Sequence, residues 1–185
     1  MSFEKAVSFT LRMEGGYVNH PADRGGETNF GVTKPALCRA FYEGIVKHTN
    51  VAALTRAEAV EIYRAFYWTP IRWEDFAEPV DAVLFDICVN HGLRNCARIA
   101  QRACISCGVV VAADGVLGPK TRAALAELSA RCPFYLAHML LIKRLAFYDA
   151  IVKARPQQKV FLNGWRARTA AMHREFVSIG NYRLR

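Results

Sequence analysis

The chain has 185 residues, of which 52% are hydrophobic and 22% are charged. This balance is typical of a globular protein with one sizeable core or two small ones, and it excludes an intrinsically disordered chain. The net charge of +9 indicates attraction to anionic polymers such as nucleic acid, acidic membranes or the bacterial envelope, without choosing among them. Neither a zinc finger nor an RNP motif is present, so no specific nucleic-acid partner is predicted.

Membrane and export signals are also missing from the sequence. The most apolar segment, Phe134 to Val152, contains His138, Lys143, Arg144 and Asp149, and these polar groups exclude a membrane span. Met1 is followed by an amphipathic segment and not by a continuous apolar stretch, so no signal peptide is predicted. We therefore expect synthesis in the cytoplasm.

The first predicted element is a short helix that runs into the motif Glu14-Gly15-Gly16-Tyr17. Behind Ser2 as an N-cap, its inward-facing residues recur at helical spacing as Phe3, Ala6, Val7, Thr10 and Leu11. Two glycines end this periodicity, so Glu14 lies on the last turn. The negative end of the helix dipole disfavours a carboxylate there and favours the protonated acid. A protonated carboxyl group is what a general acid needs at neutral pH.

The loop from Asn19 to Thr33 supplies partners for Glu14. It contains Asp23 and Thr28, together with three glycines that let the backbone turn tightly and approach a ligand, namely Gly25, Gly26 and Gly31. A protonated and an ionised carboxyl group can flank a glycosidic bond, with a hydroxyl group that helps to hold water. The alternative is purely conformational, because many turns contain Asp, Gly and Thr.

Two further helices are predicted from their start signals. Thr33 and Pro35 open a helix that continues to Ile45, and Thr55 with Glu58 forms a capping box for the next one.

Tyr67 and Trp68 lie at the end of that second helix, which Pro70 closes. Their rings can stack on sugars in a cleft wall or pack in the core.

Residues Val80 to Asn90 are apolar almost all round and predict a central buried helix. Asp86 and Asn90 share one face of that helix and need polar partners if they are buried. Either they face the substrate cleft, where they bind sugar hydroxyls or orient the Glu14 loop, or they belong to a structural network. Gly92 is predicted to end the helix.

The cysteines are compatible with a disulfide scaffold, a metal site or packing in the core. Their spacing favours packing, because one face of a predicted helix carries Cys96, Ile99, Ala100, Ala103, Cys104 and Cys107. The sequence has no second CxxC pair and no His pair at ligand spacing, so neither a metal nor another cofactor is predicted. We expect buried, reduced thiols.

The run ADGVLGPKT follows the cysteine-bearing helix. Gly118 sets a turn in it, and Pro119 fits the first turn of another helix. By itself this pattern reports architecture more than ligand contact. A long helix from Phe134 to about Ala154 comes next, and a last helix starts at about Trp165.

Several of these runs together carry a resemblance that spans nearly the whole chain. In order they are EGGYVNHPADRGGETNFGVT, YWTPI, VDAVLFDICVNHG, ADGVLGPKT and FLNGWRAR. They resemble glycoside hydrolase family 108, whose members are similar to lysozymes. The resemblance implies a muramidase region, residues 1–90, and a helical peptidoglycan-binding region, residues 91–185, packed against it. The fold implied is all-α, mainly helical and lysozyme-like, with a small loop or hairpin at the active site.

The resemblance also assigns roles. The acid of the Glu-Gly-Gly-Tyr motif is taken as the catalytic acid in that family, which carries over to Glu14. The spacing of Asp23 and Thr28 is similar to the Glu, Asp, Thr arrangement of phage lysozymes, although the last interval is shorter by one residue. Relatives commonly have Asp where this chain has His20, so the second carboxylate is expected at Asp23. The residues expected to bind substrate are Tyr17, Asn29, Tyr67, Trp68, Asp86 and Asn90.

The sequence therefore predicts a hydrolase that cleaves peptidoglycan between N-acetylmuramic acid and N-acetylglucosamine, with bacterial peptidoglycan as its partner. The alternative is a non-catalytic peptidoglycan-binding or secretion-accessory protein with the same fold. Without a signal peptide, we expect action at the cell wall or periplasm after release by a holin-like or non-standard route. The sequence carries no signal for an oligomeric state.

Overall fold

The computed structural model describes residues 3–18 and 26–178. Within them the protein is mainly helical, with seven α-helices and a single two-stranded sheet, which confirms the predicted fold class. The chain divides into two compact units, residues 2–72 and 73–185, with Met1 assigned to the second. In the described part of the chain, no helix is both long and apolar enough to cross a membrane.

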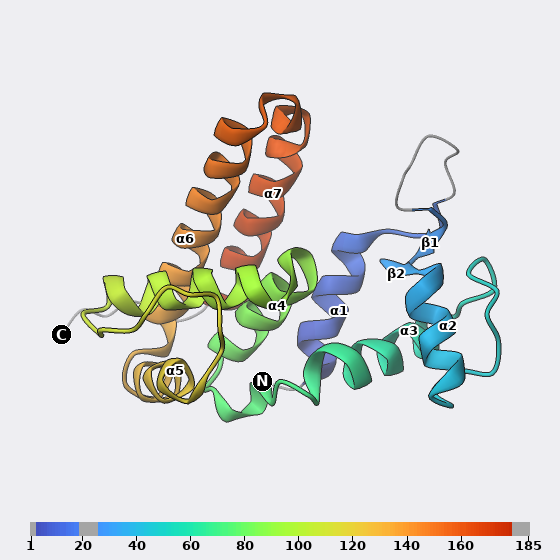
Figure 1. The fold of residues 1–185 in the computed structure, drawn as a ribbon, viewed down its shortest axis with the longest axis horizontal. Helices are drawn as coiled ribbons and strands as arrows, with labels where there is room; N and C mark the ends of the chain where they lie inside the picture. The colour runs from blue at the N-terminus through green and yellow to red at the C-terminus, as the bar shows by residue number, and fades with distance from the viewer. Residues whose placement is uncertain (1–2, 19–25, 179–185) are drawn as a thin grey trace. The chain divides into compact units, whose positions relative to one another are not determined.

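The unit of residues 2–72 is built from three short helices and the hairpin (Figure 1). In chain order its elements are α1 (Phe3–Glu14), β1 (Thr28–Asn29), β2 (Val32–Thr33), α2 (Lys34–Tyr42), α3 (Arg56–Tyr63) and the π-helical turn η1 (Arg64–Trp68). The predicted start signals are confirmed, because Thr33 caps α2 and Thr55 forms a complete capping box with Glu58. The prediction that α2 reaches Ile45 is wrong, since the chain turns at Gly44 with a φ of +76°.

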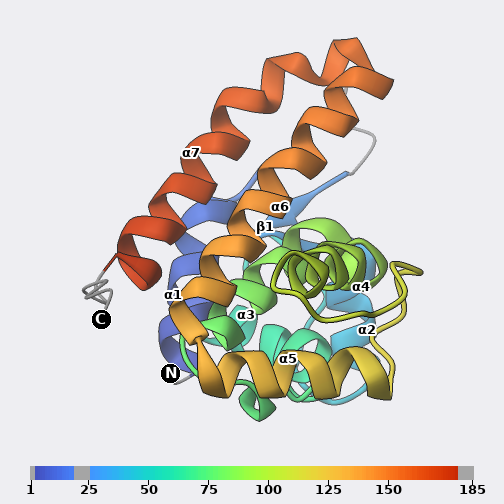
Figure 2. The ribbon, with the colours of Figure 1, turned by 90° about the vertical axis from the view of Figure 1, so that its left-hand side faces the viewer.

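The unit of residues 73–185 contains the longer helices. Its elements are η2 (Trp73–Asp75), α4 (Val80–Ser106), α5 (Pro119–Arg131), α6 (Pro133–Ala154), η3 (Pro156–Phe161), α7 (Leu162–Met172) and η4 (His173–Val177). Figures 1 and 2 show α6 and α7 side by side as a pair, and η3 joins them. The last helix starts earlier than the predicted Trp165, because η3 leads directly into Leu162.

Helix α4 is the centre of this unit. Its first part is buried from Val80 through Cys88, as predicted for a central helix. Gly92 interrupts it with a φ of +74° and a ψ of 160°, and a second helical segment then runs to Ser106. The glycine therefore ends the buried segment, as predicted.

The cysteine stripe on the second segment of α4 is confirmed in part. Cys96 and Cys104 are buried, and all the cysteines are free thiols. Burial raises the pKa of the Cys104 thiol to about 12, which keeps it protonated and unreactive. Cys107 is only half-buried, because it lies at the C-cap where the helix leaves the core.

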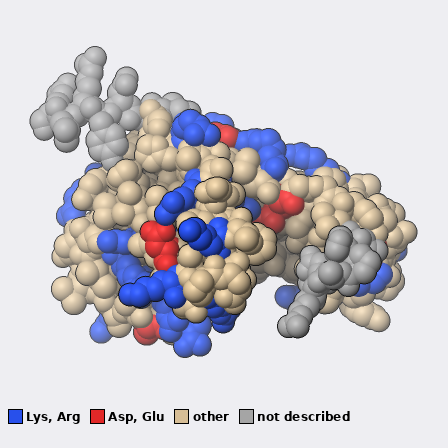
Figure 3. Space-filling model, turned by 90° about the horizontal axis from the view of Figure 1, so that it is seen from above, with Lys and Arg blue, Asp and Glu red and all other residues tan. Residues whose placement is uncertain are grey.

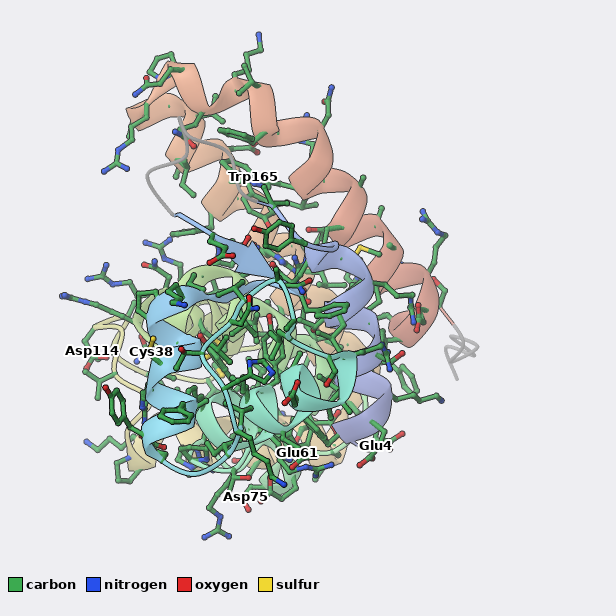
Figure 4. All side chains as sticks on the ribbon, turned by 90° about the vertical axis from the view of Figure 1, so that its right-hand side faces the viewer. Glu4, Cys38, Glu61, Asp75, Asp114 and Trp165 are labelled. Carbon is green, nitrogen blue, oxygen red and sulfur yellow. The ribbon has the colours of Figure 1, made fainter. Side chains whose placement is uncertain are left out.

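The ADGVLGPKT run forms a hydrogen-bonded turn at the start of α5. Gly118 is the N-cap and Pro119 the first residue of the helix. The buried Gln101 amide donates to Asp114 Oδ1 at 2.7 Å and to Thr121 Oγ1 at 3.2 Å. Asp114, labelled in Figure 4, thus contributes to the turn itself, in keeping with an architectural motif.

Candidate active site

Glu14 is the last residue of α1. Gly15 follows with a φ of +81°, a conformation in which glycine ends helices readily. The opposite face of α1 is buried through residues such as Phe9 and Leu11, so the helix is fixed and Glu14 emerges half-buried at its end. The predicted placement of the acid on the last helical turn is confirmed.

The side chain of Glu14 packs against the turn of the hairpin. A Cβ atom added to Gly31 would lie 2.9 Å from Glu14 Cγ and 2.6 Å from Tyr63 Oη. Only glycine fits there, and its φ of +75° is a second reason for glycine. Tyr63 Oη also donates a hydrogen bond of 3.0 Å to the carbonyl oxygen of Phe30, the other turn residue. Glu14, Gly31 and Tyr63 therefore meet at one point.

The hairpin itself is short and tightly specified. Thr28 pairs with Thr33 and Asn29 with Val32, and the turn residues between them both have positive φ, as in a type I′ turn. Val18 extends this ladder through two backbone hydrogen bonds with Thr28, of 2.8 and 2.9 Å. The backbone of Thr28 is thus held from both sides, and its side chain is half-buried.

Asp23, the predicted second carboxylate, lies outside the described residues, as does His20. The catalytic roles of Asp23 and Thr28 therefore stay predictions.

One aromatic and one acidic side chain, Tyr17 and Glu27, lie at the edge of the hairpin. Tyr17 is 47% exposed, and its hydroxyl group donates to Glu27 Oε1 at 3.0 Å. The sequence reading missed Glu27, although its position directly before Thr28 in the glycine-rich loop was a usable signal. It also missed Tyr63, because the sequence does not distinguish this residue from the others on the buried face of α3. A tyrosine in a buried stripe carries a hydroxyl group that needs a partner.

Other residues expected to bind substrate are engaged in the fold. Asn29 is 6% exposed, and its amide donates to the carbonyl oxygens of Val51 and Leu54 at 3.1 and 3.3 Å. Trp68 is 7% exposed and packs edge-on against Phe3 at 5.2 Å between ring centroids. These contacts support structural roles, and sugar binding by either residue stays a prediction.

Tyr67 is half-buried beside Tyr63, with ring centroids 5.5 Å apart. Of the aromatic residues expected to bind substrate, Tyr17 and Tyr67 are more exposed than Trp68.

Asp86 and Asn90 belong to a buried polar network in the unit of residues 73–185. Both carboxylate oxygens of Asp86 are paired, one with Arg144 at 2.7 Å and the other with Arg168 at 2.6 Å, and Asp86 and Arg144 have no exposed surface. Burial raises the pKa of Asp86, but the two guanidinium groups outweigh it and lower the pKa to about 2. Asn90 Oδ1 accepts from Arg144 at 3.2 Å and from Tyr148 at 3.1 Å. These contacts support the structural alternative.

Both parts of the chain match known protein families. The family described as Glycosyl hydrolase 108 matches residues 7–92, and the family described as Predicted Peptidoglycan domain matches residues 95–170. The chain is also similar to the solved structure of SagA from Brucella abortus, with a TM-score of 0.70 and 32% sequence identity over 93% of this chain and 91% of that one. This chain belongs to glycoside hydrolase family 108. Comparison with curated proteins found no match.

Membership of family 108 and the peptidoglycan domain make the protein a glycoside hydrolase that acts on peptidoglycan, with a lysozyme-like fold. The family 108 match extends beyond Arg72, where the first compact unit ends, so the division into regions 1–90 and 91–185 stays a prediction.

The surface charge suits an anionic wall. On the face drawn in Figure 3, lysine and arginine cover more area than aspartate and glutamate, and the whole chain carries a net charge of +9. Across residues 3–18 and 26–178, no group of three or more His, Cys, Asp or Glu is arranged to hold a metal ion.

Proposed function

We propose that this protein is an N-acetylmuramidase that cleaves peptidoglycan between N-acetylmuramic acid and N-acetylglucosamine, with Glu14 as the general acid. The observation that carries the proposal is the position of Glu14. Its aliphatic stem is held against Gly31 and beside Tyr63, while the residue stays half-buried at the end of a fixed helix. A general acid needs such a fixed carboxyl group within reach of the leaving oxygen.

In this mechanism Glu14 donates its proton to the glycosidic oxygen as the bond to the leaving sugar breaks. Asp23, with Thr28, positions the attacking water or stabilises the positive charge that develops on the sugar ring. Because peptidoglycan lies outside the cytoplasmic membrane, we also propose that the enzyme reaches the cell wall by a holin-like or non-standard route.

The test compares the wild type with Glu14→Gln on purified peptidoglycan, with released fragments identified by mass spectrometry. Glutamine keeps the size and hydrogen bonding of the side chain but removes the transferable proton, so the rate should fall by about 10²- to 10⁴-fold. The matched control is Glu61→Gln. Glu61, labelled in Figure 4, lies on α3 of the same unit with a 58% exposed side chain, and its substitution should leave the rate unchanged.

Each outcome decides a separate part of the proposal. Fragments that end in reducing N-acetylmuramic acid and disappear with Glu14→Gln support the muramidase. Reducing N-acetylglucosamine ends would reassign the bond to a glucosaminidase. An unchanged rate in Glu14→Gln would refute its role as the acid. A wild type that binds the wall but cuts no glycan would favour the accessory protein.

A further inference from the structure

A pocket of about 570 Å³ opens in the unit of residues 73–185, where α4, α6, η3 and α7 meet. Its walls include Asn90 and Asn95 from α4, Tyr148 from α6, Gln158 from η3 and Trp165 from α7. A volume of this order accommodates a small organic ligand. The pocket is built from residues of one unit only, and Glu14 is not among them.

Three aromatic rings stack in a row, and two of them, Tyr148 and Trp165, line this pocket. Tyr148 is 1% exposed, and its ring lies 4.9 Å from that of Trp165 at an interplanar angle of 18°. Trp165, labelled in Figure 4, stacks in turn on Phe161 at 5.9 Å and 25°. Phe161 is 53% exposed. Trp165 is thus held in place between two rings, and the surface that it leaves exposed forms an apolar part of the pocket wall that a sugar can contact.

Two amide side chains in the walls, those of Asn90 and Gln158, have hydrogen-bonding capacity to spare. Asn90 Oδ1 accepts from Arg144 and Tyr148, which fixes the amide. Its Nδ2 group, like the side-chain amide of Gln158, has no hydrogen-bond partner among the described residues. Amides of this kind bind hydroxyl and acetamido groups, since each carries both donors and an acceptor.

The walls are nearly uncharged. Arg155 is the one cation among the residues that line the pocket, it is exposed, and the same set contains no aspartate or glutamate. Burial, and then the positive charge of Arg144, lowers the pKa of His91 to about 3, so this wall residue is neutral at physiological pH. An uncharged pocket suits the glycan of peptidoglycan better than the stem peptide, because the stem carries carboxylate and amino groups.

We propose that this pocket is a glycan-binding subsite that holds an N-acetylated amino sugar of the peptidoglycan strand, apart from the sugars at Glu14. The choice of ligand rests on the function proposed above. The subsite keeps the enzyme on the polymer, and the Asp86 network supports its wall by fixing Asn90 and Tyr148.

The test measures binding of the N-acetylglucosamine tetramer, which has no peptide, to the Glu14→Gln protein by tryptophan fluorescence. Trp68 and Trp73 are 7% and 0% exposed, whereas Trp165 lines the pocket, so Trp165 should dominate the response. We expect Trp165→Phe to abolish most of the signal. Gln158→Ala should weaken binding about fivefold to tenfold, which corresponds to about 1 kcal/mol.

Val160→Ala is the matched control, because Val160 lies on η3 beside Phe161, is 78% exposed and does not line the pocket. It should bind the tetramer like the parent protein. An affinity of Gln158→Ala equal to that of the parent protein would overturn the proposal, as would the absence of any fluorescence response to the tetramer. A response to a stem tripeptide but not to the tetramer would overturn the assignment to glycan. No cleavage is measured here, so failure of this subsite is distinct from failure of Glu14 as the acid.

Discussion

The two compact units place their ionisable groups in opposite ways. In residues 2–72 the acid is half-buried at a helix end, and backbone turns and glycines determine its position. In residues 73–185 Asp86 is fully buried and held by two arginines. The first arrangement leaves a carboxyl group partly exposed, as the role proposed for Glu14 requires, whereas the second uses a carboxylate as part of the scaffold.

Both units share a local feature, a glycine of positive φ directly after a residue of a proposed site. Gly15, with a φ of +81°, follows Glu14, and Gly92, with a φ of +74°, follows His91. The helix stops at each glycine and leaves the preceding side chain at its end. The chemistry differs because the surroundings differ. Glu14 stays half-exposed, while His91 is held neutral by burial and lines a pocket.

The largest effect on stability is expected from Asp86→Asn. The substitution leaves Arg144 buried without its counter-ion, so the free energy of unfolding should fall by about 3–5 kcal/mol. Urea denaturation measures this loss of unfolding free energy. Asp149→Asn is the control, because Asp149 pairs with Arg166 at 2.9 Å on the surface and should cost less than about 1 kcal/mol. Equal losses in the two variants would show that the buried network is not the scaffold of its unit.

The difference in unfolding free energy between the wild type and Asp86→Asn should depend on pH. A carboxylate whose pKa is lowered to about 2 in the folded state stabilises the protein fully above its unfolded pKa, about 3.9. That contribution is lost as the pH falls from about 4 towards 2. The difference between wild type and Asp86→Asn should therefore be constant above about pH 5 and should narrow below about pH 4. A difference that already narrows near pH 6 would contradict the lowered pKa.

The next largest effect is expected on activity, from Gly31→Ala. The added Cβ would lie 2.9 Å from Glu14 Cγ, so the acid or the turn must move. A shift of about 1 Å in a catalytic group costs about 100-fold in rate. Gly44→Ala is the control, because Gly44 has nearly the same φ, +76°, but nothing within 4 Å of its added Cβ. Its rate on peptidoglycan should match the wild type, and a similar loss in both variants would trace the effect to backbone strain alone.

Local features of this fold could be read from the sequence, and long-range ones could not. The capping box at Thr55, the end of α1 at Gly15 and the start of α5 at Pro119 each depend on neighbouring residues, so their spacing predicts them. The partners of Asp86 lie 58 and 82 residues away along the chain. No local pattern points to them.

The same distinction between local and long-range features applies to the candidate site. The position of Glu14 at a helix end and a tight turn at Gly31 follow from the motif and its loop. The contact of Tyr63 with a turn that lies 33 residues earlier needs the folded chain. Burial of Asn29 and Trp68 is similarly non-local, because an amide or an aromatic ring at such positions fits either a cleft or a core.

The smallest effect is expected from Tyr63→Phe, and it tests how Glu14 is held. Loss of the hydrogen bond to the Phe30 carbonyl should cost about 0.5–1.5 kcal/mol of unfolding free energy, while Tyr42→Phe, at a residue that is 85% exposed, should cost nothing measurable. The decisive measurement is the double variant. Tyr63 Oη is the atom nearest to a Cβ at Gly31, at 2.6 Å, so its removal should return part of the activity that Gly31→Ala loses. Losses that simply add would mean that the two residues act independently of each other, and that Tyr63 does not help to position the acid.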